Sequence, residues 1–354
     1  MAACKILILG ASYGSLLGTK LAMAGHEVTL VCLPAEAEAI NRDGVVLRLP
    51  VRGHDAVEIH SKSLPGKVSA EGPGTVNPAD YDLVALAMQE PQYRSPGVRE
   101  LLDAVARARV PCMSIMNMPP LVYLERIPGV NTGALASAYT DATVWQSFNA
   151  ADVTLCSPDP QAFRPPGEPI NVLQVTLPTN FKAARFDADE PTRMLREMQA
   201  GIDAIRWNQG GETIELPVKL KVHDSVFVPL AKWAMLVTGN YRCIARDGPR
   251  SIKDAVHANV EASRAVYDWV RELCIDLGAA PGDLVPFEKY AAAARGLVRP
   301  SSAARALYAG APDIERVDRL VQLIARQKGM RNAVVDEIVE LVDDRLEKNR
   351  KAVA

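Results

Sequence analysis

Residues 5–31 decide the fold, and they read KILILGASYGSLLGTKLAMAGHEVTLV. A short apolar run is followed by a glycine-rich turn, a segment of helical length and a second run rich in β-branched residues. This order predicts a βαβ unit. Because the backbone N–H groups at the start of the helix in such a unit can hold a pyrophosphate, the stretch also predicts a dinucleotide site.

The turn carries the candidate cofactor-binding residues. They are Gly10, Ala11, Ser12, Tyr13 and Gly14. A G-x-x-x-G pattern is weak by itself, but a strand precedes it and a helix that ends at Gly25 follows it, which supports a nucleotide-binding turn. The alternative is a glycine-rich turn that binds no ligand.

Length and composition indicate a globular protein of two domains. The chain has 354 residues, more than one hydrophobic core usually supports, and 48% of them are hydrophobic against 23% charged. The formal net charge of -2 provides no general attraction to nucleic acid or to anionic membranes, so neither is an expected partner. The first residues do not resemble a secretion signal, and residues 6–9 are far too few to cross a bilayer, so a cytoplasmic location is expected.

The six cysteines are scattered along the chain and contain no C-x-x-C pair. Their neighbours are mostly apolar. This pattern favours buried thiols in a reducing compartment over disulfides or metal ligands, so no metal site is expected.

Strands alternate with helices through the first half of the sequence. Helices are expected at 35–41, 96–109 and 189–204, strands at 44–49, 57–60, 81–87 and 110–116, and a loop at 61–80, which is rich in Gly, Pro and Ser. Short strand-like runs also occupy much of 152–216. Because the strands on either side of the helices are nearly all apolar, the pattern predicts a parallel sheet that is covered on both faces.

Beyond residue 217 the strand signals fade and helical periodicity takes over. The periodic segments are 222–240, 252–277, 284–295 and 314–346. The predicted fold class is therefore α/β, with an N-terminal Rossmann doubly wound sheet followed by an all-helical C-terminal domain. The dinucleotide-binding domain is expected over residues 1–215 and a domain for substrate binding and dimerisation over 216–354, and the charged run 345–351 is expected to be a solvated helix end.

The N-terminal motif resembles that of the ketopantoate reductase family, within the 6-phosphogluconate-dehydrogenase-like superfamily. Members typically begin with strand-GxGAxGSLLG-helix-GHxVTLV, and this chain reproduces the pattern from Gly14 onward with a loop one residue shorter. Gly10 matches the first family glycine and Gly14 the third, while Ala11 or Ser12 replaces the middle one. A side chain at that middle position is expected to shift the phosphates or to weaken their binding.

The resemblance extends thinly along nearly the whole chain. A family Lys-x-x-Gln pattern is similar to Leu86–Gln89, which keeps Gln89, and a family Asn-Gly is similar to Asn117-Met118, which keeps Asn117. The resemblance implies that Gln89 and Asn117 contact the cofactor. It further implies that Asn117 contacts the substrate.

The family's catalytic helix, Lys-x-x-x-Asn-x-x-x-Asn, resembles residues 232–240, with Leu236 at the first asparagine. Lys232 lies in an apolar run, where a buried ammonium is costly unless it is paired or faces a polar cleft. The resemblance implies that Lys232 donates a proton to a carbonyl oxygen that receives hydride, a role that suits a desolvated lysine. On a continuous helix Asn240 would lie about 80° from Lys232, so both could face one cleft. The alternative for Lys232 is a surface lysine whose stem covers apolar neighbours.

A serine-rich turn and an acid complete the resemblance. They correspond to Ser301, Ser302 and Glu315. The resemblance implies that the two serines bind the substrate carboxylate, that Glu315 fixes the substrate and the lysine, and that Asn240 helps to hold the substrate. The alternatives are a helix cap for the serines and an ordinary exposed helix acid for Glu315.

The end of the second strand indicates the type of nicotinamide cofactor. Residues 31–34 contain no acid for a ribose diol, which favours NADP without excluding NAD. NADP-dependent members of the family commonly carry arginine where this chain has Leu33, and Arg42 is a candidate substitute.

The expected function is NAD(P)H-dependent reduction of a small 2-oxo acid, or oxidation of a 2-hydroxy acid, by a homodimer with Lys232 as proton donor. Leu86, Met118 and Leu236 replace polar or small family residues. Because they make the expected pocket more apolar, a substrate other than ketopantoate is expected.

Three other functions fit parts of the sequence. An opine-dehydrogenase-like enzyme would use His223 and Asp224, but on a continuous helix His223 would lie about 180° from Lys232. The turn also fits G-x-S-x-G, which would make Ser12 the nucleophile of a serine hydrolase, although only a few residues precede it and no earlier strand supplies an oxyanion loop. A non-catalytic NADP-binding sensor would explain the missing glycine without any chemistry.

Overall fold

The structure is a computed structural model that describes residues 3–353. The chain forms two compact units. The first takes the N-terminal part through Met88, Gln92–Met116 and Val144–Asp224, and the second takes Gln89–Pro91, Asn117–Thr143 and the chain from Ser225 onward. The domain boundary expected between residues 215 and 216 stays a prediction. The units add a feature that periodicity does not show, because a segment from the middle of the chain joins the C-terminal unit.

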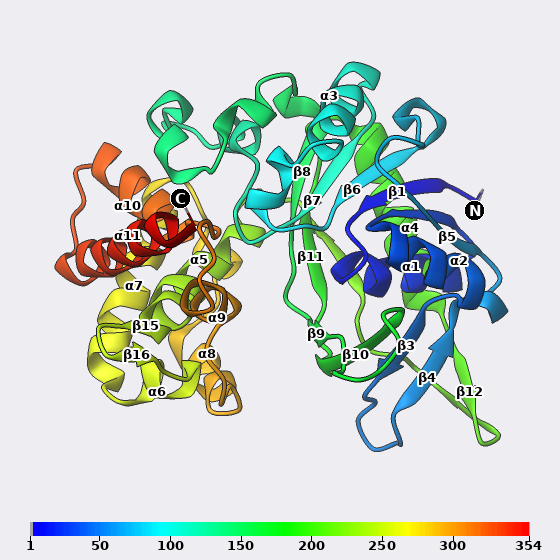
Figure 1. Ribbon diagram of the computed structural model, residues 1–354. Coiled ribbons are helices and arrows are strands. Elements are labelled where there is room, and N and C mark those ends of the chain that lie inside the picture. Colours follow the sequence, from blue (N-terminus) through cyan, green and yellow to red (C-terminus); the bar gives the residue numbers. More distant parts are fainter. Residues whose placement is uncertain (1–2, 354) are drawn as a thin grey trace. The chain divides into compact units, whose positions relative to one another are not determined.

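An eight-stranded sheet forms the framework of the first unit (Figure 1). In spatial order its strands are β14 (Leu220–His223), β11 (Phe181–Ala184), β8 (Val153–Ser157), β7 (Cys112–Ile115), β6 (Leu83–Leu86), β1 (Lys5–Leu9), β2 (Glu27–Val31) and β5 (Lys67–Glu71). Neighbours are parallel except β8 and β11, which are antiparallel. The central strands β1 and β6 are almost completely buried, which explains their nearly continuous apolar sequences.

The helices of this unit make the sheet doubly wound. They are α1 (Tyr13–Met23), α2 (Pro34–Asp43), α3 (Val98–Ala108) and α4 (Asp189–Ala204). The step from β1 to β2 and the step from β6 to β7 run in opposite directions across the sheet. Because such parallel crossovers are right-handed, α1 and α3 lie on opposite faces. The strand order reverses between β1 and β6, and the glycine turn follows β1 at this switch point, where α/β proteins bind ligands.

A smaller sheet and a hairpin complete the first unit. The sheet has the order β4 (Val57–His60), β3 (Val46–Leu49), β10 (Val172–Leu177), β9 (Gln161–Phe163), and the hairpin joins β12 (Trp207–Gln209) to β13 (Glu212–Ile214). Strands β3 and β10 pair in parallel although they are far apart in the sequence. This pairing brings the chain after β9 to the region of the glycine turn.

The loop expected over residues 61–80 is wrong, because strand β5 lies within it. β5 pairs in parallel with β2 along its whole length. The side chain of Asn41 fixes it further: Nδ2 donates to the carbonyl oxygen of Ala70 at 2.7 Å, and Oδ1 accepts the N–H of Ala70 at 2.9 Å. A short edge strand of mixed polarity depends on such distant partners, so its local sequence carries little strand signal.

The second unit is mainly helical, as predicted (Figure 1). Its α-helices are α5 (Lys232–Met235), α6 (Ile252–His257), α7 (Val260–Asp276), α8 (Phe287–Ala294), α9 (Ser302–Tyr308), α10 (Val317–Gln327) and α11 (Ala333–Val353). One two-residue hairpin, β15 (Ile244–Ala245) with β16 (Gly248–Pro249), interrupts the helices. The single helix expected over 314–346 is two helices, because the chain turns at Gly329, which has a φ of +71°.

The continuous helix expected over 222–240 is also wrong. Residues 220–223 form β14, and the helical part is a 3₁₀ turn (Pro229–Ala231), then α5, then a π-helix (Leu236–Asn240). The side chain of Tyr290 lies against the π-helix. The hydroxyl of Tyr290 donates to the carbonyl oxygen of Met235 at 3.1 Å, and a Cβ on Gly239 would lie 1.9 Å from that same hydroxyl. The tyrosine side chain comes from another helix and competes with the backbone hydrogen bonds of this one. Local periodicity therefore does not predict the π-helix.

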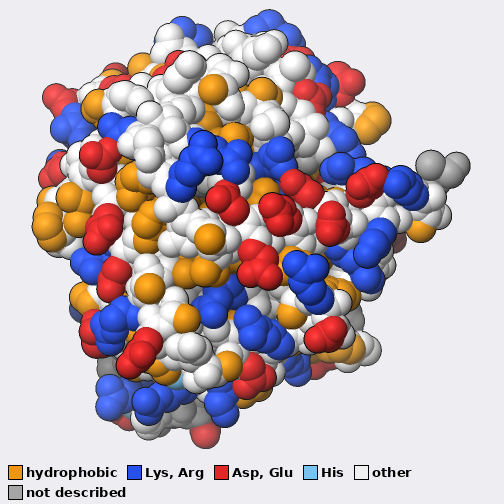
Figure 2. All heavy atoms as spheres, turned by 90° about the vertical axis from the view of Figure 1, so that its left-hand side faces the viewer, with side chains coloured by type: hydrophobic (Ala, Val, Ile, Leu, Met, Phe, Trp, Pro, Cys, Tyr) orange, Lys and Arg blue, Asp and Glu red, His pale blue; other side chains and the backbone are white. Residues whose placement is uncertain are grey.

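Charged side chains of both signs are interspersed on the face that Figure 2 shows, with apolar side chains in small groups between them. Within residues 3–353 no helix is long and apolar enough to cross a membrane. All six cysteines are free thiols, and those at positions 112, 156, 243 and 274 are buried.

Candidate functional site

Three glycines near the N-terminus stand where a Cβ atom would come too close to neighbouring atoms of the first unit. Gly10 has a φ of +106°, and a Cβ there would lie 2.8 Å from a carbonyl oxygen of the loop after β6. Cβ atoms on Gly14 and Gly18 would lie 2.8 Å from the side chain of Ile8 and 3.0 Å from that of Val28. Gly10 therefore permits the turn, and the other two glycines let α1 pack closely on β1 and β2.

The shortened turn still delivers the start of α1 to the carboxyl end of β1. The N–H of Gly10 donates to the carbonyl oxygen of Val31 at 2.8 Å, and Ser15 Oγ donates to the carbonyl oxygen of Ala11 at 2.5 Å. Ser12 precedes the helix, and its side chain makes no capping hydrogen bond. Because the first N–H groups of a helix have no intrahelical acceptor, this end of α1 suits a phosphate group.

Arg164, which the sequence reasoning missed, lies beside the turn. Its Nη2 donates to the carbonyl oxygen of Ala11 at 3.2 Å and forms an ion pair with Glu36. The Glu36 carboxylate also accepts the N–H of Leu33 at 3.1 Å. The ion pair therefore lies at the carboxyl end of β2, where dinucleotide-binding proteins contact the adenosine ribose.

Arg42, which the sequence suggested as a replacement for the family's arginine, is bound to another residue. Its guanidinium is bound to the adjacent Asp43 at 2.8 Å and is largely exposed. No sequence pattern pointed to Arg164, because it follows β9 far along the chain. The pairing of β9 with β10, and of β10 with β3, brings it to the turn.

The residues of two alternative functions are placed unfavourably for them. The Ser12 hydroxyl forms no hydrogen bond with any residue between 3 and 353, so no described base activates it. His223 ends strand β14 and does not share a helix with Lys232, while Asp224 is paired with Arg196 at 2.5 Å. Neither the serine hydrolase nor the opine dehydrogenase gains support from this geometry.

In the second unit, Lys232, Glu315 and Asn117 form one group. Asn117 Nδ2 donates to Glu315 Oε2 at 3.4 Å, and the charge of Lys232 acts on the Glu315 carboxyl group. Lys232 is the first residue of α5 and is half-buried, as is Glu315. The other amide atom of Asn117, Oδ1, is buried and accepts no hydrogen bond from the described residues. Since a buried acceptor without a partner is costly, this oxygen suits a ligand that donates to it.

A second acid, Glu90, belongs to the same group and was also missed. Its backbone N–H donates to Glu315 Oε1 at 3.4 Å. Its carboxylate is buried and accepts the N–H and the hydroxyl of Thr140 at 3.0 and 2.8 Å. The family pattern ends at Gln89, so only the structure shows that the next residue is a buried acid.

The pKa of Glu315 is raised to about 7. Burial of the carboxyl group is the main cause, and the negative charge of Glu90 adds to the rise. The hydrogen bonds from Asn117 and from the Glu90 N–H, together with the charge of Lys232, lower the pKa and limit the rise. A carboxyl group with a pKa near neutrality exchanges its proton under ordinary conditions, which suits acid–base chemistry.

The two predicted serines lie at the start of α9, and one of them contacts Asn240. Asn240 ends the π-helix, so the angle of about 80° expected from a continuous α-helix does not apply. Ser301 Oγ donates to the carbonyl oxygen of Asn240 at 2.7 Å and accepts the N–H of Ala304 at 3.1 Å. Ser301 therefore caps α9 and ties it to the π-helix, while Ser302 is exposed.

The remaining predicted positions differ in their exposure. Gln89 is exposed, whereas Leu86, Met118 and Leu236 are buried. The three apolar residues thus replace polar or small family residues with buried hydrocarbon. Across residues 3–353, no group of three or more His, Cys, Asp or Glu side chains could hold a metal ion.

No protein-family model matches the sequence, and no curated protein matches it. Solved structures do match. A protein from Ralstonia solanacearum MolK2, provisionally classed as a ketopantoate reductase, has a TM-score of 0.69 at 14% identity, with 98% of this chain and 99% of that chain covered. The 2-dehydropantoate 2-reductase from Methylococcus capsulatus has a TM-score of 0.64 at 16% identity, with 97% of each chain covered.

A D-mandelate dehydrogenase, solved with NADH and anilino(oxo)acetate, is similar to the same extent. Its TM-score is 0.64 at 12% identity, with 98% of this chain and 99% of that chain covered. At these identities the likeness concerns the fold. It confirms the predicted fold class and the resemblance stated from the sequence. The chain has the fold of the ketopantoate reductases over nearly its full length.

Proposed function

We propose that the protein is an NADPH-dependent reductase of a small 2-oxo acid, with Lys232 as the proton donor. The observation that carries the proposal is the group of Lys232, Asn117, Glu90 and Glu315 in a chain whose fold is shared with NAD(P)-dependent oxidoreductases. A lysine whose charge acts on an acid with a pKa near neutrality can give up a proton and receive another.

The cofactor-binding residues of the proposal come mainly from the first unit, whereas Gln89 and Asn117 belong to the second. Gly10–Gly14 and the start of α1 suit the pyrophosphate, and Gln89 and Asn117 add polar contacts, as the family resemblance implies. Leu33 provides no positive charge for a 2′-phosphate, and Arg164 provides it instead. To bind the phosphate, Arg164 leaves its ion pair with the Glu36 carboxylate. The cofactor supplies hydride.

Arg164→Ala tests the preference between the two cofactors. The dissociation constant for NADPH should rise about 10- to 100-fold while that for NADH changes little, because only NADPH carries the 2′-phosphate. Fluorescence titration measures both constants. If Arg164→Ala weakens the binding of both cofactors equally, Arg164 stabilises the turn and does not select the 2′-phosphate. In that case Glu36→Gln should be the variant that weakens NADH binding.

The second unit supplies the proton and the substrate contacts. As hydride reaches the carbonyl carbon, Lys232 Nζ gives a proton to the carbonyl oxygen, so that the product is the 2-hydroxy acid. Glu315 fixes Lys232, and the free acceptor of Asn117 orients the substrate. Asn240 adds a contact and Ser302 binds the carboxylate, while Ser301 contributes through its link to Asn240.

The substrate is expected to be more apolar than ketopantoate. Met118 and Leu236 stand where the family has polar or small residues, and both are buried. A branched or aromatic 2-oxo acid would suit such surroundings better than a hydroxylated one.

The proposal also includes the location and the oligomeric state of the protein: it acts in the cytoplasm as a homodimer.

The direct test is NADPH oxidation with a panel of branched and aromatic 2-oxo acids, followed at the nicotinamide absorbance. At least one acid should be reduced, and ketopantoate should be a poorer substrate. If NADPH binds and no acid oxidises it, the non-catalytic sensor replaces this proposal. A fluorophosphonate that labels Ser12 would instead revive the hydrolase.

A further inference from the structure

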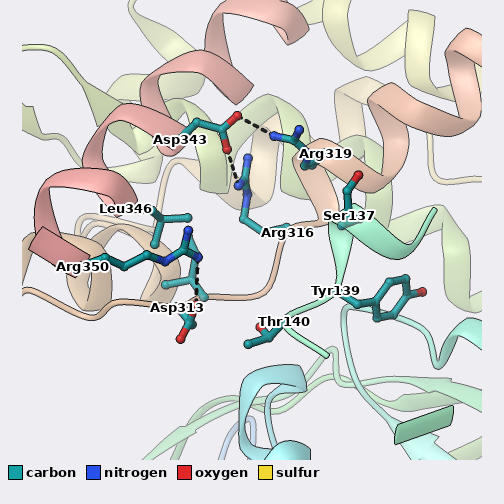
Figure 3. Close-up of a pocket in the computed structure, with 11 residues that line it drawn as sticks. Ser137, Tyr139, Thr140, Asp313, Arg316, Arg319, Asp343, Leu346 and Arg350 are labelled. Carbon is teal, nitrogen blue, oxygen red and sulfur yellow. Dashed lines mark hydrogen bonds and ion pairs between the residues drawn. The ribbon is translucent and has the colours of Figure 1, made fainter. Parts of the chain in front are cut away.

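A cavity of about 250 Å³ lies within the second unit, beside the 313–316 segment. We call it the arginine cavity, after Arg316, Arg319 and Arg350, which line it together with Asp313 and Asp343. Figure 3 shows these side chains converging from α10, from α11 and from the segment before α10. The chain around Ser137 and Thr140 forms the facing wall.

Ion pairs hold the arginines in place. Asp343 is shared: it accepts Arg316 Nη1 at 2.6 Å and Arg319 Nη1 at 2.5 Å. Asp313 accepts Arg350 Nη2 at 2.9 Å. Arg316 is also bound by the buried Asp318 at 2.9 Å, so the three guanidinium groups are matched by three carboxylates, and binding of an anion here depends on free N–H donors rather than on excess charge.

Some of the N–H donors of these arginines have no acceptor within residues 3–353. Arg319 Nε is buried and has no acceptor among the described residues. Each guanidinium has five N–H groups, and Arg319 uses only Nη1 toward Asp343, while Arg350 uses Nε toward Pro312 and Nη2 toward Asp313. A buried N–H without an acceptor is costly, so the cavity is better satisfied when an anion fills it.

No sequence pattern indicated this cavity. The expectation that residues 345–351 form a solvated helix end is wrong for Leu346 and Asn349, which are buried, whereas Arg350 is exposed. Asn349 is buried and donates to the carbonyl oxygens of Leu307 and Ala311 at 2.7 and 2.9 Å, and Arg350 reaches the cavity wall. The contacts of Asn349 hold the end of α11 against α9 and the segment that follows it.

We propose that the arginine cavity is a binding site for a small oxyanion, a phosphate or a short carboxylate, which accepts from Arg319 and Arg350. Guanidinium groups bind both oxyanions through paired N–H donors. The volume is below the range of about 300–1,000 Å³ that is usual for drug-sized ligands, so the occupant is small. The Ser137 hydroxyl supplies a further donor on the facing wall.

The site is connected to the catalytic group of the proposed function, and this step rests on that proposal. Thr140 lines the cavity and also donates to Glu90, whose N–H contacts Glu315. Ile314 and Arg316, on either side of Glu315, line the cavity as well. An anion that shifts this wall therefore changes the surroundings of Glu315, so the proposed site is an effector site.

Isothermal titration of the full chain tests binding, with inorganic phosphate, sulfate and malonate as separate probes at constant ionic strength. Phosphate or malonate should saturate one site, and the stronger of the two identifies the class of ligand. Arg319→Gln and Arg350→Gln should each weaken binding about tenfold or more. Arg326→Gln is the control, since Arg326 lies on α10, pairs with Asp336 and is outside the cavity.

A second variant covers the case in which loss of an arginine unfolds the unit. Ser137→Phe leaves every ion pair intact and fills the cavity from its exposed wall, so it should abolish anion binding without lowering the thermal unfolding temperature. Absence of saturable binding by all three probes in the wild type would overturn the proposal. Unchanged affinity in both Arg350→Gln and Ser137→Phe would do the same. If anions bind and leave the pH profile of NADPH oxidation unmoved, only the effector role fails, and the proposed function stands.

Discussion

The glycine turn of the first unit and the Lys232 segment of the second differ in where their geometry comes from. The turn depends on sterics between neighbours along residues 5–31: a positive φ at Gly10 and two glycines that face their own β-strands. The Lys232 segment, residues 229–240, depends on contacts from α8 and α9, made by Tyr290 and Ser301. Geometry of the first kind is visible in a sequence pattern, and geometry of the second kind is not.

In the proposed function, cofactor binding depends on the first region and proton transfer on the second. In that function the turn binds the nucleotide, while the Lys232 segment supplies the proton. Changes in one region should therefore leave the task of the other intact.

The largest effect is expected for Lys232→Ala. Turnover should fall by about 10²- to 10⁴-fold, because general acid catalysis contributes about that much. The dissociation constant for NADPH should stay the same, as measured by fluorescence titration. Lys253→Ala, which changes an exposed lysine of α6, is the matched control. A Lys232→Ala enzyme with normal turnover would remove the lysine from the mechanism.

Gly10→Ala is expected to affect the other region. It should lower the free energy of unfolding by about 2–4 kcal/mol, since both a positive φ and a backbone contact oppose the methyl group. NADPH binding should weaken as well. Gly53→Ala is the control, because Gly53 also has a positive φ (+81°) but has open space around it. It should cost only about 1 kcal/mol in urea unfolding, and an equal cost for the two variants would contradict the close approach.

Gly239→Ala tests the π-helix. The added methyl group would meet the Tyr290 hydroxyl, so unfolding should become easier by about 1–3 kcal/mol. Tyr290→Phe removes that hydroxyl, and in the double variant part of the loss should be recovered. A double-mutant cycle in urea measures the coupling. Additive effects of the two changes would show that the hydroxyl does not control this part of the helix.

The smallest effect is expected from the pH dependence of Glu315. Its pKa is raised from an ordinary 4.5 to about 7, so between these values the folded state binds more protons than the unfolded state. The free energy of unfolding should therefore fall as the pH rises from about 4.5 to 7. Glu315→Gln should remove about 1–2 kcal/mol of that fall, a value reduced for partial exposure.

Glu90→Gln sharpens the same test. Without the negative charge of Glu90, the ionised form of Glu315 becomes easier to form, and the inflection near pH 7 in the kcat/KM profile should move to lower pH. The glutamine keeps an acceptor for Thr140. A profile that does not move would mean that Glu90 serves only to anchor Thr140.

Much of the fold was accessible from the sequence, and the reason is physical. Strand β1, helix α1 and strand β2 follow their local pattern, and α4 occupies the expected residues. β5 was missed because an edge strand of mixed polarity takes its structure from β2 and from Asn41. β14 was missed for a similar reason, since it is completed by pairing with β11.

The candidate site was accessible only in part. The family pattern singled out Lys232, Asn117 and Glu315, which the structure places in one group. It could not single out Glu90 or Arg164, because each reaches its group through contacts made far along the chain and neither occupies a family motif. Single-sequence patterns report local periodicity, whereas buried acids and ion pairs are arrangements in space.

The central claim is that the chain transfers hydride from NADPH to a 2-oxo acid. The most direct measurement uses NADPH that carries deuterium at one or the other position of nicotinamide C4, with mass spectrometry of the product. The account predicts that one of the two labelled cofactors delivers a single deuterium to C2 of the 2-hydroxy acid. NADPH that binds to the turn while neither label ever appears in a product would contradict the account.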